Sequence, residues 1–408
     1  MGVEGLVYSN ISSRFVRDAN TNLVLLTIQQ KKLISRSEIA KLTNLSYPTV
    51  STIIKTLMDE GFVSESHVGE FVGGRKPMLI KFNPKARVII GVDLSTSVSQ
   101  AVLADLDGKF ISEIITGGEL GTEIDLSRNI KDVIERLQET TGFDWQKVVG
   151  IGVSYRGSID IPNRLYYGPG KKEPLKLQDE LEEYFDVPIV MEHNYNLAML
   201  AEYTYGIAQG VDNSVFINVG SGISAGIMIS GQIYHGFLGN AGEFGHIMVD
   251  SQGDICPECG RRGCLETFVS ISNIIIHARK CGLEITQMDN KLQELKYIAD
   301  LARKNEPVAR SCFNRTAHYL SIGIIDIVNL LNPELVILGG QVIWVYPEIV
   351  KIITEEVMNE SLLYSRKNLR IESANQIKQT FLMGAIALIQ EQIYLPHNIS
   401  IQYSTSGS

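Results

Sequence analysis

The spacing of apolar residues predicts a helix-turn-helix near the N-terminus. Within residues 46–57, apolar side chains recur at positions i, i+3, i+4 and i+7, which is the period of a helix with one buried face. These apolar residues are Val50, Ile53, Ile54 and Leu57. Ser46 suits the N-cap of this helix, and Pro48 suits its first turn. Residues 35–57 are therefore expected to form two short helices that meet at a tight turn.

The polar face of the second helix suggests DNA recognition. It carries side chains that can donate hydrogen bonds, namely Tyr47, Thr49, Ser51, Thr52 and Lys55. A donor-rich face backed by a buried one suits the major groove of DNA. We expect Thr49, Ser51 and Thr52 to contact base edges or adjacent phosphates, with Ser46 and Tyr47 flanking them. A helical hairpin is also a common packing unit, so the motif by itself leaves both interpretations open.

The flanking segments extend this motif into a winged helix-turn-helix. Residues 22–30 fit a packing helix before it, and Gly61 suits the C-cap after it. Residues 62–82 are rich in β-forming types and are interrupted by a glycine-rich, basic run. That pattern predicts a two-stranded wing whose tip approaches a phosphate backbone or the minor groove. We expect Lys55 and Arg75 to make phosphate or groove contacts.

Charge is distributed unevenly along the chain. Residues 1–85 hold 11 Lys and Arg against 7 Asp and Glu, a net charge of +4, whereas the whole chain of 408 residues carries −9. The remainder therefore carries −13. A basic head on an acidic body supports the DNA-binding interpretation. Apolar runs are too short to span a membrane and no signal peptide is visible, so we expect a cytoplasmic protein without a membrane partner.

The acidic body shows strand patterns that repeat. Residues 88–94 predict a buried strand with an acidic residue, Asp93, near its end, and residues 100–108 predict a second strand followed by a hairpin turn. A similar strand-rich stretch recurs at residues 214–231. Two such units, each followed by helical material, predict an internally duplicated α/β protein with two lobes. A cleft between lobes is the usual place for a ligand.

Three of the five cysteines lie within nine residues: Cys256, Cys259 and Cys264. In a reducing compartment this clustering favours a metal site over disulfides. Cys281 and Cys312 stand apart, and we expect both to be small buried hydrophobic residues.

Two neighbouring motifs give the chain a specific resemblance. Residues 239–246 read Gly-Asn-Ala-Gly-Glu-Phe-Gly-His, and residues 256–266 hold the cysteines together with Gly263 and Glu266. Together with Asn332–Gly340 and the pair at 384–385, they resemble the ROK family of repressors, open reading frames and kinases. The resemblance implies a two-lobed actin/hexokinase-like (ribonuclease H-like) α/β domain, here preceded by a winged helix-turn-helix.

The resemblance also implies domain boundaries. We expect the winged helix-turn-helix over residues 1–82 and a ROK sugar-binding domain over residues 86–408. Its lobes would comprise roughly residues 86–195 with the C-terminal end, and residues 196–380.

The resemblance supplies a fourth metal ligand. It implies that His246 joins Cys256, Cys259 and Cys264, and one His with three Cys is the tetrahedral set of a structural zinc site. The family usually has Cys-x-Cys where this chain has Cys-x-x-Cys. Because that longer spacing is itself common in zinc sites, we expect the site to persist with an altered loop.

A set of polar residues is expected to bind sugar hydroxyls. In ROK sugar kinases the positions that match Glu243, His246 and Glu266 contact the sugar, and carboxylates are suited to accept hydrogen bonds from paired hydroxyls. The resemblance adds a pocket glycine and two residues of the 192–196 stretch. These are Gly157, His193 and Asn194. Arg156 either reaches an anionic ligand or pairs with a neighbouring acid.

Two departures argue against kinase activity. ROK kinases use an Asp as general base, and Asn194 stands at that position; an amide is not a base at neutral pH. The phosphate loop of the kinases is glycine-rich, whereas residues 93–97 contain no glycine. The leading hypothesis is therefore a sugar-responsive transcriptional repressor, a homodimer or tetramer that releases double-stranded operator DNA when sugar binds. The alternative is an active sugar kinase with an appended DNA-binding domain, and xylose, glucose, an amino sugar or a β-glucan disaccharide all fit the polar ring.

Overall fold

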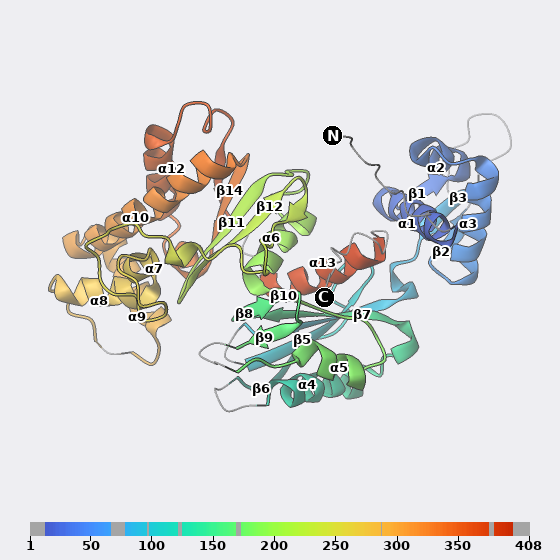
Figure 1. The fold of residues 1–408 in the computed structure, drawn as a ribbon, viewed down its shortest axis with the longest axis horizontal. Coiled ribbons are helices and arrows are strands. Elements are labelled where there is room, and N and C mark those ends of the chain that lie inside the picture. The colour runs from blue at the N-terminus through green and yellow to red at the C-terminus, as the bar shows by residue number, and fades with distance from the viewer. Residues whose placement is uncertain are drawn as a thin grey trace, which may run out of the picture. The chain divides into compact units, whose positions relative to one another are not determined.

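The computed structural model describes the chain as two compact units (Figure 1). The described residues are 13–66, 78–95, 98–120, 125–168, 173–286, 288–374 and 379–394. The first unit comprises residues 1–155, 176–191 and 385–408, and the second comprises residues 156–175 and 192–384. Residues 156–175 thus belong with the second unit, whereas we had placed them in the first lobe. No helix among the described residues is long and apolar enough to cross a membrane.

The N-terminal head is a winged helix-turn-helix, as predicted. Its elements are α1 (Ser13–Lys31), β1 (Leu33–Ser35), α2 (Arg36–Thr43), α3 (Tyr47–Asp59), β2 (Val63–Ser66) and β3 (Leu79–Phe82). The wing forms a three-stranded sheet in the order β1-β3-β2, because the short β1 adds an edge that we had not predicted. The four apolar residues of α3 are buried, so the periodicity read from the sequence is confirmed.

Capping residues fix where the two helices of the motif begin and end. Ser35 and Glu38 form a capping box at the start of α2, and Asn44 ends that helix in the left-handed conformation at φ 56°. Ser46 then caps α3 by accepting a hydrogen bond from the backbone N–H of Thr49 at 3.3 Å. Gly61, at φ +80°, follows α3, where its lack of a side chain permits this turn.

The rest of the first unit is built on a five-stranded sheet in the order β10-β7-β4-β5-β6. Its strands are β4 (Val88–Asp93), β5 (Val98–Asp105), β6 (Ile115–Glu119), β7 (Val148–Tyr155) and β10 (Ile189–His193). In Figure 1, α4 (Leu126–Thr141) and α5 (Leu177–Tyr184) lie below this sheet and α13 (Thr380–Tyr394) lies above it. Short 3-10 helices, η1 (Pro84–Ala86) and η2 (Trp145–Lys147), connect these elements.

The second unit repeats this topology with the sheet β15-β14-β11-β12-β13. Its strands are β11 (Ser214–Val219), β12 (Ile223–Ile229), β13 (Gln232–Ile233), β14 (Leu335–Gly339) and β15 (Arg370–Ser373). In both sheets the first strand pairs antiparallel with the second and parallel with a later strand. The prediction of an internally duplicated α/β fold is therefore confirmed.

Helices cover both faces of the second sheet. The remaining elements are β8 (Ser158–Asp160), β9 (Leu165–Tyr167), α6 (Asn194–Tyr205), η3 (Phe244–His246), α7 (Glu266–Val269), α8 (Ile271–Lys280), α9 (Lys291–Arg303), α10 (Pro307–Leu331), α11 (Gln341–Val345) and α12 (Ile349–Glu360). Along β11, Val215 and Ile217 point into the core formed with α10, whereas Phe216 packs with α6. This alternation reflects the two-residue period of a strand.

Candidate functional site

The start of α3 presents the residues predicted to contact DNA. The Tyr47 side chain is 55% exposed, and Thr52 and Lys55 are also exposed, whereas Thr49 and Ser51 are half-buried. The Thr52 hydroxyl donates to the carbonyl of Pro48 at 3.0 Å, so its lone pairs remain available as acceptors. Arg75 lies outside the described residues.

An ion pair joins the motif to its wing. Arg36, the first residue of α2, contacts Glu65 of β2 with 2.7 Å between Nη2 and Oε1. The helix-turn-helix and its wing therefore form one folded head with a defined α3 surface.

A buried carboxylate organises the junction between β10 and α6. One oxygen of Glu192 accepts hydrogen bonds from the backbone N–H of His193 at 2.7 Å and from the Asn196 amide at 3.0 Å. The other oxygen contacts Nε2 of His235 at 2.6 Å. Burial alone would raise the pKa of Glu192, but these hydrogen bonds and the nearby imidazoles hold it below its usual value. We had not assigned Glu192 or His235 to the site, although Glu192 begins the stretch that drew attention to Asn194.

Asn194 and His193 take different positions at this junction. Asn194 is the first residue of α6. His193 is 0% exposed, and its ring stacks on that of Tyr195 with centroids 4.7 Å apart. Burial lowers the pKa of His193 to about 4, against the opposing effect of Glu192, so its imidazole is neutral at pH 7. Because its ring is fully buried, His193 supports the start of α6 from beneath and does not line a solvent-exposed surface.

The predicted pocket glycine has a backbone role. Gly157 has φ +117°, and a Cβ built on it would lie 2.2 Å from the carbonyl oxygen of Tyr167. The β8–β9 hairpin therefore requires glycine here for steric reasons that do not depend on a ligand.

Glu243, His246 and Glu266 are brought together around η3. Nε2 of His246 lies 3.9 Å from a carboxylate oxygen of Glu243. Glu266 starts α7 and accepts the backbone N–H of Ile223 at 3.0 Å. Desolvation raises the pKa of both carboxyl groups, and the Glu266 charge adds to the effect at Glu243. Both carboxyl groups thus lie close to η3, since a Cβ on Gly245 would lie 3.2 Å from a Glu266 oxygen, and both belong to the same unit as Asn194.

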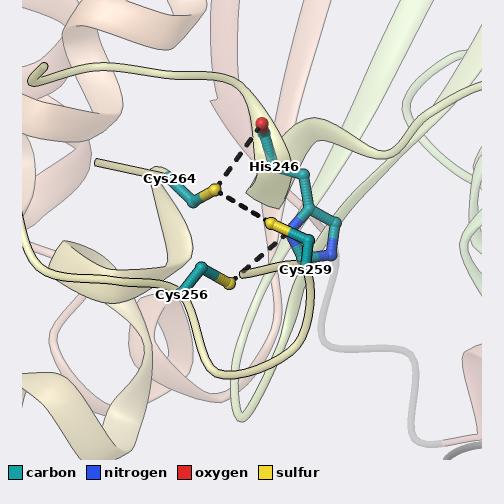
Figure 2. Close-up of side chains that lie close together, drawn as sticks. All are labelled: His246, Cys256, Cys259 and Cys264. Atoms are coloured by element: carbon teal, nitrogen blue, oxygen red, sulfur yellow. Dashed lines mark hydrogen bonds between the residues drawn. The ribbon is translucent and has the colours of Figure 1, made fainter. Parts of the chain in front are cut away.

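The four predicted metal ligands converge on one point (Figure 2). The ligand atoms of His246, Cys256, Cys259 and Cys264 all lie within 4.8 Å of one another. Sγ of Cys256 lies 3.8 Å from Nδ1 of His246, and the sulfurs of Cys259 and Cys264 lie 3.4 Å apart. A tetrahedron with bonds of about 2.3 Å has edges of about 3.8 Å, so a single metal ion fits this set.

Loop geometry makes the convergence possible. The backbone N–H of Cys256 bonds to the carbonyl of Arg261 at 2.7 Å, which closes the Cys-x-x-Cys turn. Gly263, at φ +70°, packs so tightly that a Cβ there would lie 1.6 Å from the carbonyl oxygen of Asp250. Cys312 is buried, as expected, but Cys281 is exposed, so the expectation of burial is wrong for Cys281; it follows the last residue of α8, at the helix end.

The Asp93 carboxylate is engaged within the loop that follows β4. Asp93 is 3% exposed and accepts the backbone N–H and the hydroxyl of Ser95 at 2.9 and 2.6 Å. Its carboxylate therefore closes a turn of its own loop. The next two residues, 96 and 97, lie outside the described part of the chain.

Comparisons with known proteins agree with this architecture. Residues 89–392 match the ROK family and residues 17–64 match the winged helix-turn-helix DNA-binding family. The chain is 30% identical over 383 residues to the xylose repressor of Caldicellulosiruptor bescii, covering 92% of this chain and 96% of that protein.

Two solved structures match different shares of this chain. The crystal structure of a ROK family transcriptional regulator, a homologue of the E. coli Mlc protein, matches with a TM-score of 0.82 at 26% identity, covering 93% of this chain and 97% of that one. The ROK hexokinase from Thermus thermophilus matches with a TM-score of 0.61 at 25% identity, covering 98% of its own length but 74% of this chain. The chain therefore belongs to the ROK family, and it carries a winged helix-turn-helix domain on the N-terminal side of its ROK domain.

Proposed function

We propose that this protein is a sugar-responsive transcriptional repressor. The observation that carries the proposal is the combination, in one chain, of a winged helix-turn-helix head with a ROK domain. The resemblance to the kinases adds to it, because it places Asn194 where they have the Asp that serves as general base. The similarity of nearly the whole chain to a protein named xylose repressor supports it. A repressor requires recognition of the sugar but no chemistry on it.

Glu192, two residues before Asn194, does not offer a free carboxylate that could replace the missing base. It is buried and already accepts hydrogen bonds from His193, Asn196 and His235. For Glu192 to take a proton from a sugar hydroxyl, these hydrogen bonds would first have to break. The loss of a general base typically lowers a rate by about 10²–10⁴-fold.

We assign sugar recognition to a polar ring in the second unit. Glu243 and Glu266 would accept hydrogen bonds from sugar hydroxyls, Nε2 of His246 and the amide of Asn194 would add further contacts, and His193 with Gly157 would fix the backbone beneath them. Arg156 is exposed and has no ion pair within the described residues, which leaves it available to an anionic sugar. The ligand is therefore to be sought among neutral sugars and sugar phosphates.

We infer that the His and Cys cluster holds a structural zinc ion. Three thiolates and one imidazole nitrogen complete a tetrahedron and leave no position for a reactive water. Nδ1 of His246 faces the sulfurs, so its Nε2 stays directed toward Glu243. The metal would thereby orient a sugar-binding group, as outer contacts of a metal ligand often do.

For DNA, we propose that α3 enters the major groove as part of a homodimer. Two heads related by two-fold symmetry match the two halves of a pseudo-palindromic operator. In this arrangement Thr49, Ser51 and Thr52 read base edges or adjacent phosphates, with Ser46 and Tyr47 beside them. Lys55 and Arg75 contribute phosphate or groove contacts.

A ligand screen tests the proposal. The thermal midpoint of the purified protein is measured with neutral sugars and sugar phosphates, and the hits are repeated on Glu243→Ala and on Arg156→Gln. We expect one sugar to raise the midpoint by several degrees, to lose this effect in Glu243→Ala, and to weaken binding to an operator fragment.

Two further results separate the alternatives. A hit that survives in Glu243→Ala but not in Arg156→Gln would move the site away from the polar ring. ATP-dependent phosphorylation of the bound sugar, followed in a coupled assay, would favour the kinase alternative over the repressor. No response to any sugar, in the presence or absence of operator, would contradict sugar sensing.

A further inference from the structure

The winged helix-turn-helix head packs directly against the rest of the first unit. Residues of the head and of the neighbouring sheet share one apolar cluster, which includes Ile28 and Phe82 of the head, Leu106 after β5, and Ile386 and Ile389 of α13. The linker contributes η1, and its Pro84 carbonyl accepts the backbone N–H of Leu106 at 3.0 Å. Because the cores merge, movement of the head relative to this sheet would expose apolar surface.

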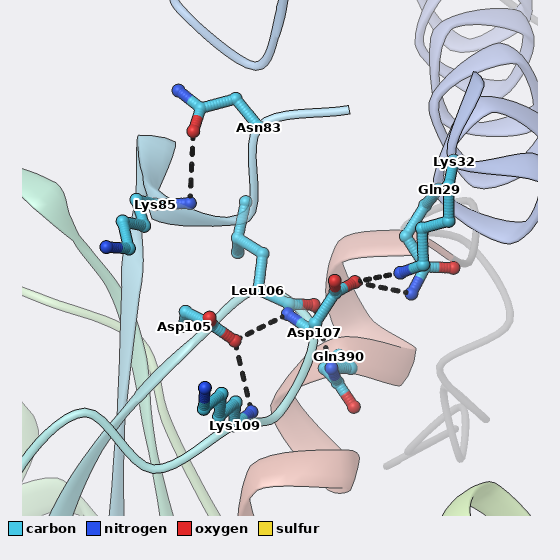
Figure 3. Close-up of polar contacts among 9 residues, drawn as sticks. All are labelled: Gln29, Lys32, Asn83, Lys85, Asp105, Leu106, Asp107, Lys109 and Gln390. Carbon is cyan, nitrogen blue, oxygen red and sulfur yellow. Dashed lines mark hydrogen bonds and ion pairs between the residues drawn. The ribbon is translucent and has the colours of Figure 1, made fainter. Parts of the chain in front are cut away.

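A polar joint borders this shared cluster (Figure 3). Oδ1 of Asp107 accepts from Nζ of Lys32 at 2.5 Å and from Nε2 of Gln29 at 3.2 Å, so the end of α1 is fixed to the turn that follows β5. Asp105, 4% exposed, holds that turn by accepting the backbone N–H groups of Asp107 and Lys109, each at 3.0 Å.

The same turn is attached to α13. Gln390 is 5% exposed, and its amide donates to the carbonyl of Leu106 at 2.8 Å. Leu106 and Asp107 are consecutive, so α13 and α1 hold adjacent residues of one turn. A shift of α13 would therefore reach the head through a single peptide unit.

The other end of α13 is packed against α6, the helix whose first residue is Asn194. A Cβ on Gly384 would lie 2.2 Å from the carbonyl oxygen of Leu197, in the helix α6 that begins at Asn194. The next residue, Ala385, is equally close to β7, since a Cβ on Gly152 would lie 2.0 Å from its carbonyl oxygen. The helix thus packs closely at both contacts, and it runs without interruption over the roughly 9 Å from Gly384 to Gln390.

We propose that α13 and the turn 105–109 form the joint through which sugar at the start of α6 changes the affinity of the head for DNA. Asn194, Leu197, Gly384, Gln390 and Asp107 then act as successive positions on one mechanical path. The inference rests on the proposed function and adds the route of regulation to it. The path carries a signal because sugar and DNA each favour one of two arrangements of the joint.

The test measures coupling and not stability alone. The dissociation constant of the full-length protein for an operator fragment is determined with and without saturating sugar, and the ratio of the two constants is compared between variants. Asp107→Ala removes the contact to α1, and Gln390→Leu removes the contact of α13 to the turn. Glu348→Ala is the matched control, since it deletes a surface carboxylate that pairs with Arg303 at 2.8 Å outside the path.

We expect the wild type and Glu348→Ala to share a ratio in the range of about 5–150-fold that is typical of allosteric coupling. In Asp107→Ala and Gln390→Leu the ratio should fall to within about twofold of one, while the sugar affinity of the DNA-free protein stays unchanged. The charge exchange Lys32→Asp with Asp107→Lys should restore coupling, which a general loss of stability would not allow.

Two results would overturn the inference. If folded Asp107→Ala and Gln390→Leu keep the wild-type ratio, the joint does not transmit the signal, although the proposed function stands. If the operator affinity of the wild type ignores every sugar that binds, the proposed function fails and the inference fails with it.

Discussion

At the scale of single residues, Glu192 holds the start of α6 to a distant loop. It is a buried carboxylate with three donors from three residues, and its partner His235 lies 43 positions later in the chain. A buried charge is tolerated only when it is paired and hydrogen-bonded. The pair therefore fixes both the backbone before Asn194 and the loop that leads to Glu243.

Removal of the His235 side chain should show how much the stability of the protein depends on its contact with Glu192. We expect His235→Ala to lower the free energy of unfolding by about 1–3 kcal/mol at pH 7, because a buried carboxylate loses a partner. His318→Ala is the matched control: its ring is 61% exposed and lies 3.4 Å from Glu356, so its loss should cost less than about 0.5 kcal/mol. Urea denaturation of both variants makes the comparison.

The pH dependence of this stability follows from the lowered pKa of Glu192. A carboxyl group whose folded pKa is depressed stabilises the protein fully above its ordinary range and loses that contribution as pH falls through the folded pKa. The destabilisation by His235→Ala should therefore be complete at neutral pH and shrink below the ordinary carboxyl range. A difference that stays constant down to acid pH would contradict this assignment.

At the scale of elements, α3 has a buried face and an exposed face with different roles. The buried face anchors the helix in the head, and the Ser46 cap fixes where it starts. The exposed face carries Thr52 and Lys55. The two side chains can make different contacts with DNA, because a short hydroxyl can discriminate between bases, whereas an ammonium group attracts any phosphate.

Salt dependence should identify the role of Lys55. If it neutralises one phosphate, Lys55→Ala reduces the slope of log affinity against log salt by about 0.9 for operator and non-operator DNA alike. Thr52→Ala should instead lower specificity and leave the slope unchanged. Fluorescence anisotropy titrations over a salt series measure both. Lys351→Ala, a lysine paired with Glu355 on α12, is the control, and a slope unaffected by Lys55→Ala would remove it from the interface.

The cysteine loop is the second element whose role can be measured. We expect one zinc ion per chain by elemental analysis in the wild type and almost none in Cys256→Ser, because a structural site requires all four ligands. Loss of the metal should also weaken sugar binding, since His246 and Cys264 lie next to Glu243 and Glu266. Cys281→Ser, which changes an exposed thiol outside the cluster, should retain the metal. If sugar binding survives complete removal of the zinc by a chelator, the cysteine loop keeps its structure without the metal.

At the scale of the whole molecule, a basic head is joined to an acidic body. The −13 charge of the body disfavours its non-specific contact with DNA, so any attraction to phosphate comes from the basic head. The head shares one apolar core with the rest of the first unit, and residues of α13 contribute to that core. The helix α13 begins in the second unit and ends in the first.

Paired heads should make the operator bipartite. If the protein binds as a homodimer, a duplex that contains one half-site should bind at least about 10²-fold more weakly than the full operator, because the second head then acts at a high effective concentration. Shifting the half-site spacing by five base pairs should cause a similar loss, since it moves one site to the opposite side of the helix. Equal affinity for full and half operators would show that the heads act singly.

Short-range features of this protein could be predicted from the sequence alone. The buried face of α3, the Ser46 cap and the duplicated strand pairs follow from residue spacing, because neighbours within a helical turn or across a strand decide them. The cysteine cluster also follows from spacing, since ligands a few residues apart can reach one ion. The resemblance added His246 and the residues proposed to bind sugar, and the structure places Glu243, His246 and Glu266 around η3.

Other features were decided only by the tertiary structure. The contact of Gln390 with Leu106 spans 284 positions, and the contact of His235 with Glu192 spans 43. No local pattern encodes such pairs, because they depend on how sheets and helices are connected in space. The same reason explains the burial of His193, the edge strand β1 and the grouping of residues 156–175 with the second unit. In this protein, spacing along the chain determined the helices, the strands and the cysteine cluster, and chain topology determined which of these elements contact one another.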